Sequence, residues 1–271
     1  MANEDIIGKV ISEMGKLDAF GCTEKPDRKA IVNILSDIQT VMFPAFTTSD
    51  GLPMRMLLEK IRWELANQIR RAIRFDGAST LDADAVTDEF LSRIPEIYRK
   101  LLTDLESIYE GDPAAKSREE IIVCYPGFFA MIVHRIAHVL YEMKVPIVPR
   151  IMSEFVHQKT GIDIHPGATI GEYFCIDHGT GIVIGETTVI GDHVKLYQGV
   201  TLGAKSFELD SDGNPVKDIK RHPNIGNHVV IYANATILGG DTYVGDGCVI
   251  GGNVWLISSV PAGKKVYYKG H

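Results

Sequence analysis

Apolar side chains in the first 160 residues recur at intervals of three and four, the spacing of one face of an α-helix. One run ends before Pro44, and a second covers residues 54–73 with charged side chains on its opposite face. A third run covers about 84–109, with Pro95 as a candidate break, and a fourth starts near Ser117 and bends at Pro126-Gly127. We therefore predict an all-helical N-terminal domain over residues 1–160.

Beyond residue 160 the apolar period changes to six. Ten of the thirteen positions on this period are Ile or Val; the positions are Ile164, Ile170, Ile176, Ile182, Thr188, Val194, Val200, Ile225, Ile231, Ile237, Tyr243, Val249 and Trp255. A hexapeptide repeat is typical of a β-solenoid, in which each unit forms one strand and one turn and directs its aliphatic side chain inward. Glycines would occupy the corners, at Gly171, Gly185, Gly191, Gly226 and Gly245. The sequence thus predicts a solenoid domain over residues 161–271 and an α+β chain.

A polar insert interrupts the repeat at about 206–224, FELDSDGNPVKDIKRHPN. Because a segment of this composition cannot enter an apolar interior, we expect it to loop outward. It ends in Lys220-Arg221-His222-Pro223, which the resumed repeat would hold close to a rigid body.

Composition narrows the function classes. The formal charge of −7, from 28 Lys and Arg against 35 Asp and Glu, argues against nucleic-acid binding. Four cysteines without a C-x-x-C pair suit a reducing compartment. The N-terminus lacks a signal-peptide pattern, and the most apolar stretch, FFAMIVHRIAHVLY, is too short and polar for a membrane span. We expect a cytoplasmic protein without a membrane partner.

The first predicted coils carry a cluster of polar candidates: Asp163, His165, Asp177, His178, Glu186 and His193. A histidine held by a carboxylate can serve as a general base, and His178 fits that description. The alternative is that the outward turns of a solenoid are simply polar. A zinc triad drawn from His165, His178, His193, His222 and His228 lacks a compact ligand spacing, so no metal is predicted. Lys264-Lys265 could meet phosphates or form a solvated tip, and His134 to His138 is more typical of a helix packing face.

The motifs together resemble serine O-acetyltransferases, a family of hexapeptide-repeat acyltransferases. The matching segments are GIDIHPGATIG, Asp177 to Glu186 (DHGTGIVIGE), Val200 to Gly203 (VTLG), Arg221 to Ile225 (RHPNI), Gly111 to Ala114 (GDPA) and Gly127 to His138. The resemblance covers residues 105–262 well and the first hundred residues loosely. It implies a left-handed parallel β-helix and acetyl transfer from acetyl-CoA to L-serine, giving O-acetylserine for cysteine synthesis.

Carried over by position, the resemblance implies that His178 takes the proton of the serine hydroxyl and that Asp163 orients the imidazole. Asp112 and Asp177 would hold the substrate ammonium, and Arg221 and His222 its carboxylate. Acetyl-CoA would be a co-substrate without any tightly bound cofactor. Its expected contacts are Gly203, Ala204, Ala233, Gly251 and Lys264.

The resemblance also implies solenoid trimers, a hexamer paired through the helical domains, active sites between subunits and inhibition by cysteine. Three departures stand out. The loop from Phe207 to Lys220 is longer than usual, Ala204 replaces a second glycine, and the tail that docks into cysteine synthase is missing after His271. We therefore do not expect that partnership for this chain.

Two alternatives remain: an acetyltransferase acting on a sugar or on homoserine, and a non-catalytic solenoid scaffold. The Asp177-His178 and Arg221-His222 pairs favour an amino acid, because a neutral sugar needs no carboxylate clamp.

Overall fold

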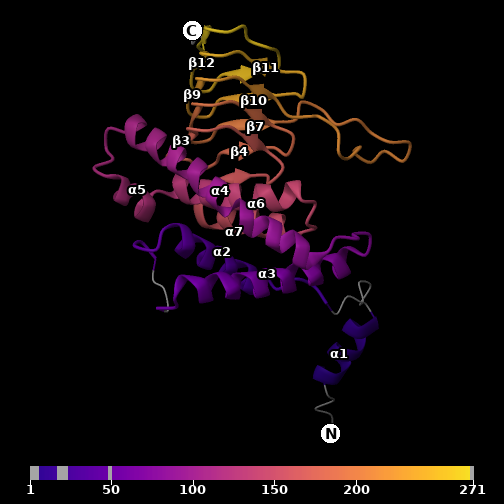
Figure 1. Cartoon of the computed structure of the whole chain (residues 1–271). Coiled ribbons are helices and arrows are strands. Elements are labelled where there is room, and N and C mark those ends of the chain that lie inside the picture. Colours follow the sequence, from indigo (N-terminus) through magenta and orange to yellow (C-terminus); the bar gives the residue numbers. More distant parts are fainter. Residues whose placement is uncertain (1–5, 17–23, 48–50, 269–271) are drawn as a thin grey trace.

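Helices form the N-terminal part of the chain, as the three- and four-residue spacing predicts (Figure 1). The computed structural model describes residues 6–16, 24–47 and 51–268; Cys22 and the last three residues therefore lie outside the described part. The helices in that part are α1 Ile6–Lys16, α2 Arg28–Met42, α3 Met54–Asp76, α4 Ala83–Gly111, α5 Arg118–Cys124, α6 Pro126–Glu142 and α7 Val148–Thr160. The four predicted runs correspond to α2, α3, α4 and the α5–α6 pair, whereas α1 and α7 are additional.

The two prolines act differently. Helix α4 runs through Pro95 without a break, so the candidate break there is wrong. Buried side chains lie on both sides of the proline, including Phe90 and Leu101, and their packing offsets the backbone hydrogen bond that proline cannot donate. Pro126 instead starts α6, where its missing N–H costs nothing, and α5 and α6 meet at 75°. No single helix among the described residues is long and apolar enough to cross a membrane; only this bent pair, taken together, passes that test by length and composition.

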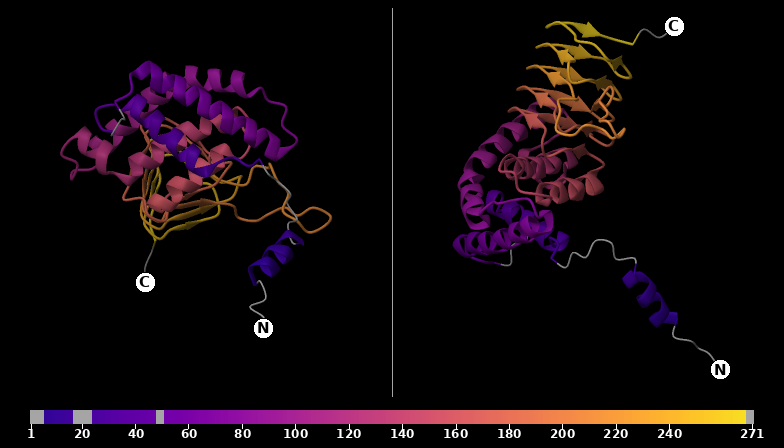
Figure 2. Two further views of the ribbon diagram at one scale, coloured as in Figure 1. Left: turned by 90° about the horizontal axis from the view of Figure 1, so that it is seen from below. Right: turned by 90° about the vertical axis from the view of Figure 1, so that its right-hand side faces the viewer.

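The C-terminal part is a parallel β-solenoid whose strands form three sheets (Figures 1 and 2). Sheet A contains β1, β4, β7, β10 and β13; sheet B contains β2, β5, β8 and β11; sheet C contains β3, β6, β9, β12 and β14. The strands are β1 Asp163–Ile164, β2 Thr169–Ile170, β3 Cys175–Asp177, β4 Val183–Ile184, β5 Val189–Ile190, β6 Lys195–Tyr197, β7 Thr201–Gly203, β8 Asn224–Ile225, β9 Val230–Ile231, β10 Thr236–Leu238, β11 Tyr243–Val244, β12 Val249–Ile250, β13 Trp255–Leu256 and β14 Lys265–Val266.

Within the predicted repeat, and apart from the long insert, the strict six-residue register fails at two corners. Ile176 and Ile184 occupy matching inward positions in successive strands but are eight residues apart, and Ile237 and Val244 are seven apart. Ile182 is still buried, because it falls on a second inward position of its coil.

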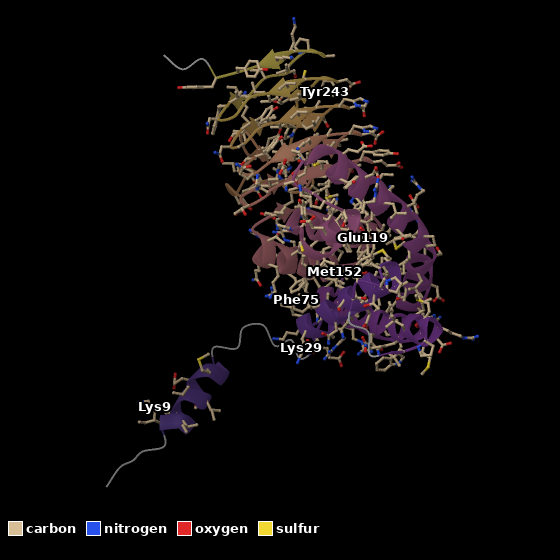
Figure 3. All side chains as sticks on the ribbon, turned by 90° about the vertical axis from the view of Figure 1, so that its left-hand side faces the viewer. Lys9, Lys29, Phe75, Glu119, Met152 and Tyr243 are labelled. Atoms are coloured by element: carbon tan, nitrogen blue, oxygen red, sulfur yellow. The ribbon has the colours of Figure 1, made fainter. Side chains whose placement is uncertain are left out.

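The second slip overturns part of the prediction. Tyr243 and Trp255 were expected to point inward, yet both are exposed, and Figure 3 shows Tyr243 on the outer surface. Val249 is also outside the interior, which is filled instead by Val244 and Ile250. The physical cause is the extra residues at the corners, which a strict period cannot detect.

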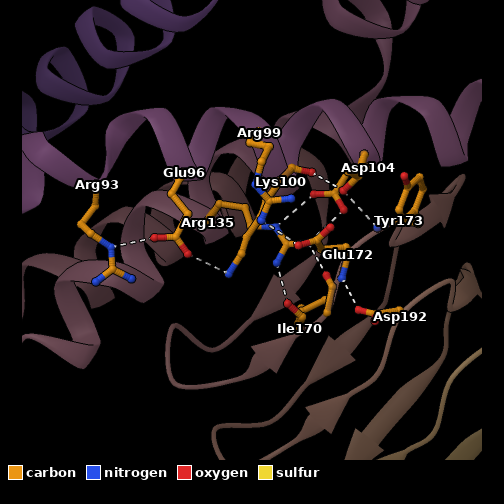
Figure 4. Close-up of polar contacts among 12 residues, drawn as sticks. Arg93, Glu96, Arg99, Lys100, Asp104, Arg135, Ile170, Glu172, Tyr173 and Asp192 are labelled. Atoms are coloured by element: carbon orange, nitrogen blue, oxygen red, sulfur yellow. Dashed lines mark hydrogen bonds and ion pairs between the residues drawn. The ribbon is translucent and has the colours of Figure 1, made fainter.

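The helical part packs on the first coil through α4, α6 and α7, and both parts share one hydrophobic core. At this junction Arg135 of α6 forms a buried ion pair with Asp104 of α4, with nitrogen–oxygen distances of 2.9 and 3.0 Å (Figure 4). Arg135 also donates to the carbonyls of Ile170 and Gly171, and Asp104 accepts from the N–H of Phe174 at 3.0 Å. These bonds tie α4, whose C-terminus leads to Asp112, to the solenoid.

Candidate active site

The corners of the solenoid form three edges, two of which carry the candidate catalytic and serine-binding residues. The CA edge comprises the turns from sheet C to sheet A, at 177–182, 198–200, 232–235 and 251–254. The AB edge comprises the turns from sheet A to sheet B, at 165–168, 185–188, 204–223, 239–242 and 257–259. The BC edge comprises the remaining turns, at 171–174, 191–194, 226–229, 245–248 and 261–264.

Asp177 and His178 lie on the CA edge at the corner with two extra residues, between β3 and β4. The extra length makes this turn longer than the next one up, where Leu196 and Leu202 are six residues apart. His178 adopts a left-handed backbone conformation with φ of 58°, and its side chain is 76% exposed. Its Nε2 lies 3.8 Å from Oδ1 of Asp177. The insertion thus presents an accessible imidazole next to a carboxylate that is largely covered.

Gly179 makes this turn possible. Its φ is 92°, and a Cβ there would lie 2.6 Å from a side-chain carbon of Ile162 and 2.7 Å from one of Ile176. Only glycine fits at this position without displacing the solenoid interior.

Asp112 reaches the same edge from the helical part, where it caps the C-terminus of α4. Its carboxylate accepts a hydrogen bond from the Tyr125 hydroxyl at 2.7 Å and from the N–H of Ala114 at 2.8 Å. These two bonds lower the pKa of Asp112, and the same contact raises the pKa of Tyr125 to about 12. Asp112 is therefore a preorganised carboxylate close enough to interact electrostatically with His178.

Lys195 on β6 joins this cluster, although its sequence position did not suggest a role. Its Nζ lies 2.7 Å from Oδ2 of Asp177 and donates to the carbonyl of Gly111 at 2.8 Å. Burial lowers the pKa of Lys195, but its hydrogen bonds to Asp177 and Tyr197 outweigh that effect and raise it to about 12. The cluster accordingly contains a permanent cation.

Asp163 lies on β1 at the end of sheet A nearest the CA edge, and it is paired in register with Val183. Its Oδ1 is 4.0 Å from Nδ1 of His157 on α7. No hydrogen bond or ion pair joins Asp163 to His178 in the described part of the chain. Glu154, His157 and Asp163 place their ligand atoms within 4.8 Å of one another; this small polar group is partly exposed.

Arg221 lies on the AB edge, at the end of the long loop. Its guanidinium forms a close ion pair with Oε2 of Glu186, whose Oε1 accepts a hydrogen bond from Tyr141 of α6 at 2.8 Å. Burial raises the pKa of Glu186, but the Tyr141 and Arg221 hydrogen bonds outweigh it and leave the pKa below its usual value. The helical part therefore helps to orient Arg221 through Glu186.

His222 is buried beside Arg221. Its Nδ1 accepts the backbone N–H of Thr187 at 3.1 Å, which leaves the proton of the neutral ring on Nε2. Burial, followed by the nearby Arg221, lowers the pKa of His222 to about 4. At neutral pH the ring is uncharged, so Arg221 is the cation of this pair and His222 anchors the segment that carries it.

The long loop leaves the solenoid at the AB edge and projects outward, as expected (Figure 1). Its outer part folds back as a small hairpin, in which Val216 donates to the carbonyl of Glu208 at 2.8 Å. Between the loop and the solenoid is a cavity of about 840 Å³ lined by Glu186, Phe207, Asp210, Asn214, Pro215, Val216, Lys217, Asp218 and Arg221. The loop thus walls the space in front of Arg221.

The residues expected to contact acetyl-CoA divide between the edges. Gly203 and Ala204 lie at the AB edge, one coil beyond Glu186, and Ala233 and Gly251 lie on the CA edge, beyond His178. Lys264 lies on the BC edge, apart from the other four.

The five histidines considered as a zinc triad also spread over all three edges. His165 and His222 lie near the AB edge, His178 on the CA edge, and His193 and His228 on the BC edge, where their rings stack 4.6 Å apart. They do not converge on one point.

Within one chain, the two halves of the candidate site face different directions. His178 and Glu186 lie beyond opposite ends of β4. The four residue steps from Ile182, the last residue of the CA turn, to Glu186 on the AB edge span up to roughly 13 Å at about 3.3 Å per extended residue. A molecule as small as an amino acid cannot touch both edges of the same solenoid.

Comparisons with known proteins point to one family. No family model matches the chain. The plasmid serine acetyltransferase of Synechococcus elongatus is 46% identical over 256 residues, covering 88% of this chain and 80% of that protein. Serine acetyltransferase 1 of Entamoeba histolytica, solved with L-cysteine, matches with a TM-score of 0.78 and 39% identity over 90% of this chain and 87% of that one.

A more distant structure is the serine acetyltransferase of Neisseria gonorrhoeae in complex with serine. It matches with a TM-score of 0.59 and 28% identity, covering 86% of this chain and 94% of that one. On the strength of the 46% identity over most of its length, the chain belongs to the serine acetyltransferases, enzymes that transfer an acetyl group to the hydroxyl of serine.

Proposed function

We propose that this enzyme takes its acetyl group from acetyl-CoA and binds L-serine between the CA edge of one solenoid and the AB edge of a neighbouring copy. The observation that carries the proposal is the separation of charge. Asp112 and Asp177 lie on one edge and Arg221 lies on the other, so two facing edges supply an anion for the ammonium of serine and a cation for its carboxylate.

The chemistry follows from the exposed imidazole. His178, as a neutral base, accepts the proton of the serine hydroxyl while the hydroxyl oxygen attacks the acetyl carbonyl carbon. The carbon–sulfur bond then breaks, O-acetylserine forms, and the CoA sulfur leaves as a thiolate that takes up a proton. Asp163 is proposed to orient His178, which requires its carboxylate to turn from His157 toward the CA edge.

Acetyl-CoA is proposed to lie along the groove between the same two edges. Gly203 and Ala204 would line one side and Ala233 and Gly251 the other, because small residues allow a chain to approach the backbone closely. Lys264 lies on the BC edge, away from this groove, and is not proposed to contact acetyl-CoA.

A site built from two edges requires a closed ring of copies, and three copies of a three-sided solenoid satisfy that need. We propose a trimer, with the helical parts pairing two trimers. The L-cysteine bound in the Entamoeba relative supports a further proposal, that cysteine occupies the serine site and inhibits.

Thiol release from acetyl-CoA, measured with L-serine, L-homoserine and a galactoside, tests the reaction. We expect release with serine and its inhibition by L-cysteine; release with the galactoside alone would contradict the proposal. His178→Ala should reduce the rate by roughly 10²- to 10⁴-fold, as expected when a general base is removed. A variant with unchanged activity would favour a different base or a scaffold role.

Mixed oligomers test the shared site. His178→Ala damages only the CA edge and Arg221→Ala only the AB edge. Co-assembly of the two inactive chains should restore activity at about a quarter of the sites, where two intact edges meet. No recovery in verified mixed oligomers would place the whole site within one chain.

A further inference from the structure

The Lys195 ammonium is largely covered and takes no part in the proposed acetyl transfer itself. We propose that Lys195 is a positioning residue that holds the Asp177 carboxylate away from His178 and joins it to the α4 terminus that carries Asp112. The inference rests on the proposed serine site and concerns how that site is kept in a productive geometry.

The geometry makes Lys195 a bridge between two elements. Its Nζ contacts Asp177 of β3 at 2.7 Å and the carbonyl of Gly111, the last residue of α4, at 2.8 Å. The ammonium also lies 4.7 Å from the centre of the Tyr197 ring, and the side chain is only 16% exposed. A cation at the C-terminus of a helix is favourable, because the terminal carbonyls carry partial negative charge.

The two carboxylates of the cluster are held differently. Asp112 has its own partners, the hydroxyl of Tyr125 and the N–H of Ala114. Asp177 lacks such bonds within the described residues: its side-chain contacts are Lys195 and the 3.8 Å approach to His178. Lys195 is therefore the group that decides where the Asp177 carboxylate points.

Loss of Lys195 would leave His178 as the nearest side chain to the Asp177 carboxylate. Because the two side chains are already 3.8 Å apart, a small rotation would bring the carboxylate onto Nε2. That contact would compete with the serine hydroxyl for the same nitrogen. Lys195 also balances charge, since the two carboxylates and one ammonium leave a net charge of −1, which matches the single ammonium of serine.

Lys195→Met keeps most of the side-chain length and removes the charge, and Lys195→Arg keeps the charge. Lys265→Met is the matched control, because Lys265 occupies the same register position on the outer face of sheet C and is exposed. The measurements are kcat and KM for L-serine and acetyl-CoA, thermal unfolding of each variant, and the same substitution in an Asp177→Asn background.

We expect Lys195→Met to lower kcat/KM for serine by about 10- to 100-fold, the size of a lost hydrogen bond between charged groups. KM for acetyl-CoA should stay within about twofold, Lys195→Arg should recover most of the activity, and Lys265→Met should match the wild type. In Asp177→Asn the further loss should be less than about threefold, because the carboxylate to be held is gone.

Three results would overturn the inference: an unchanged kcat/KM for serine, an equal loss in both backgrounds, or a lower KM for serine. The last would mean that Lys195 competes with the substrate ammonium. If the wild type releases no CoA with serine, the proposed function is wrong. The role of Lys195 is then tested by thermal unfolding alone, and equal melting temperatures for Lys195→Met and Lys265→Met would contradict the positioning role as well.

Discussion

The imidazole of His222 lies directly against the backbone of Gly185, so closely that a Cβ at Gly185 would come within 2.0 Å of the ring. Every amino acid other than glycine carries a Cβ, which at position 185 would overlap the His222 ring. Gly185 therefore permits the burial of His222, and His222 in turn fixes the segment that presents Arg221.

Gly185→Ala should consequently displace His222 and Arg221 together. We expect a loss of about 1–3 kcal/mol in the free energy of unfolding, as for other overpacked sites, and a higher KM for serine. Gly15→Ala is a suitable control, since a Cβ at Gly15 meets open space. Chemical denaturation and serine kinetics measure both effects; a stable variant with normal KM would show that the loop adapts.

The neutral state of His222 predicts a pH dependence of stability. The pKa of His222 is about 4 in the folded protein and about 6.5 in the unfolded chain. At a pH between these two values, the imidazole is mostly protonated in the unfolded chain and mostly neutral in the folded protein. Stability should therefore fall as the pH drops below about 6.5, with His222 contributing about 2 kcal/mol of loss between pH 7 and pH 5.

His222→Asn tests that contribution, because asparagine does not titrate and its carbonyl can accept the Thr187 N–H. Urea denaturation at pH 7 and pH 5 should show a smaller pH-dependent loss for the variant. His134 and His165, whose pKa values burial also lowers, remain in both proteins and contribute to the residual slope. An identical slope in the two proteins would mean that His222 is protonated in the fold.

Tyr141→Phe removes the hydroxyl that orients Glu186 and, through it, Arg221. We expect KM for serine to rise by about three- to tenfold, the value of one ordinary hydrogen bond, because the hydroxyl acts on Arg221 only through Glu186; KM for acetyl-CoA should change little. Tyr243→Phe, on the exposed outer face of sheet B, should leave both constants unchanged. A rise in both constants for Tyr141→Phe would indicate a general disturbance of the α6 junction instead.

Asp104→Asn breaks the buried pair with Arg135 and leaves an uncompensated buried guanidinium. Loss of one partner of such a pair typically costs about 3–5 kcal/mol. Arg99→Ala removes a partly exposed pair with Glu172 at 2.8 Å, and it should cost less than about 1 kcal/mol. Equal costs in denaturant titrations would show that the junction does not depend on the buried pair.

Periodicity alone predicted most of the fold. The change from a helical to a six-residue period located the transition, and α7 ends at Thr160, three residues before β1 begins. It failed at the corners, because a hydrophobic pattern reports which side chains are buried but not how many residues a turn contains. Tyr243 and Trp255 were misplaced for that reason.

The candidate site rests on resemblance rather than on spacing. His178, Asp177, Asp112 and Arg221 were predicted from their motifs, and their roles stay predictions. Lys195 was missed, although it follows Asp177 by three hexapeptides, a separation that places two residues on neighbouring coils.

Sequence by itself determined the repeating strand and the candidate chemistry, because burial of an aliphatic side chain at each sixth residue and the identity of each motif are local properties. Only the tertiary structure decided which side chains meet. It paired Lys195 with Asp177, turned Asp163 toward His157, and placed Asp177 and Arg221 on different edges of one solenoid. Those relationships depend on the length of each corner and on where the helices dock, and both are set by packing between residues far apart in the chain.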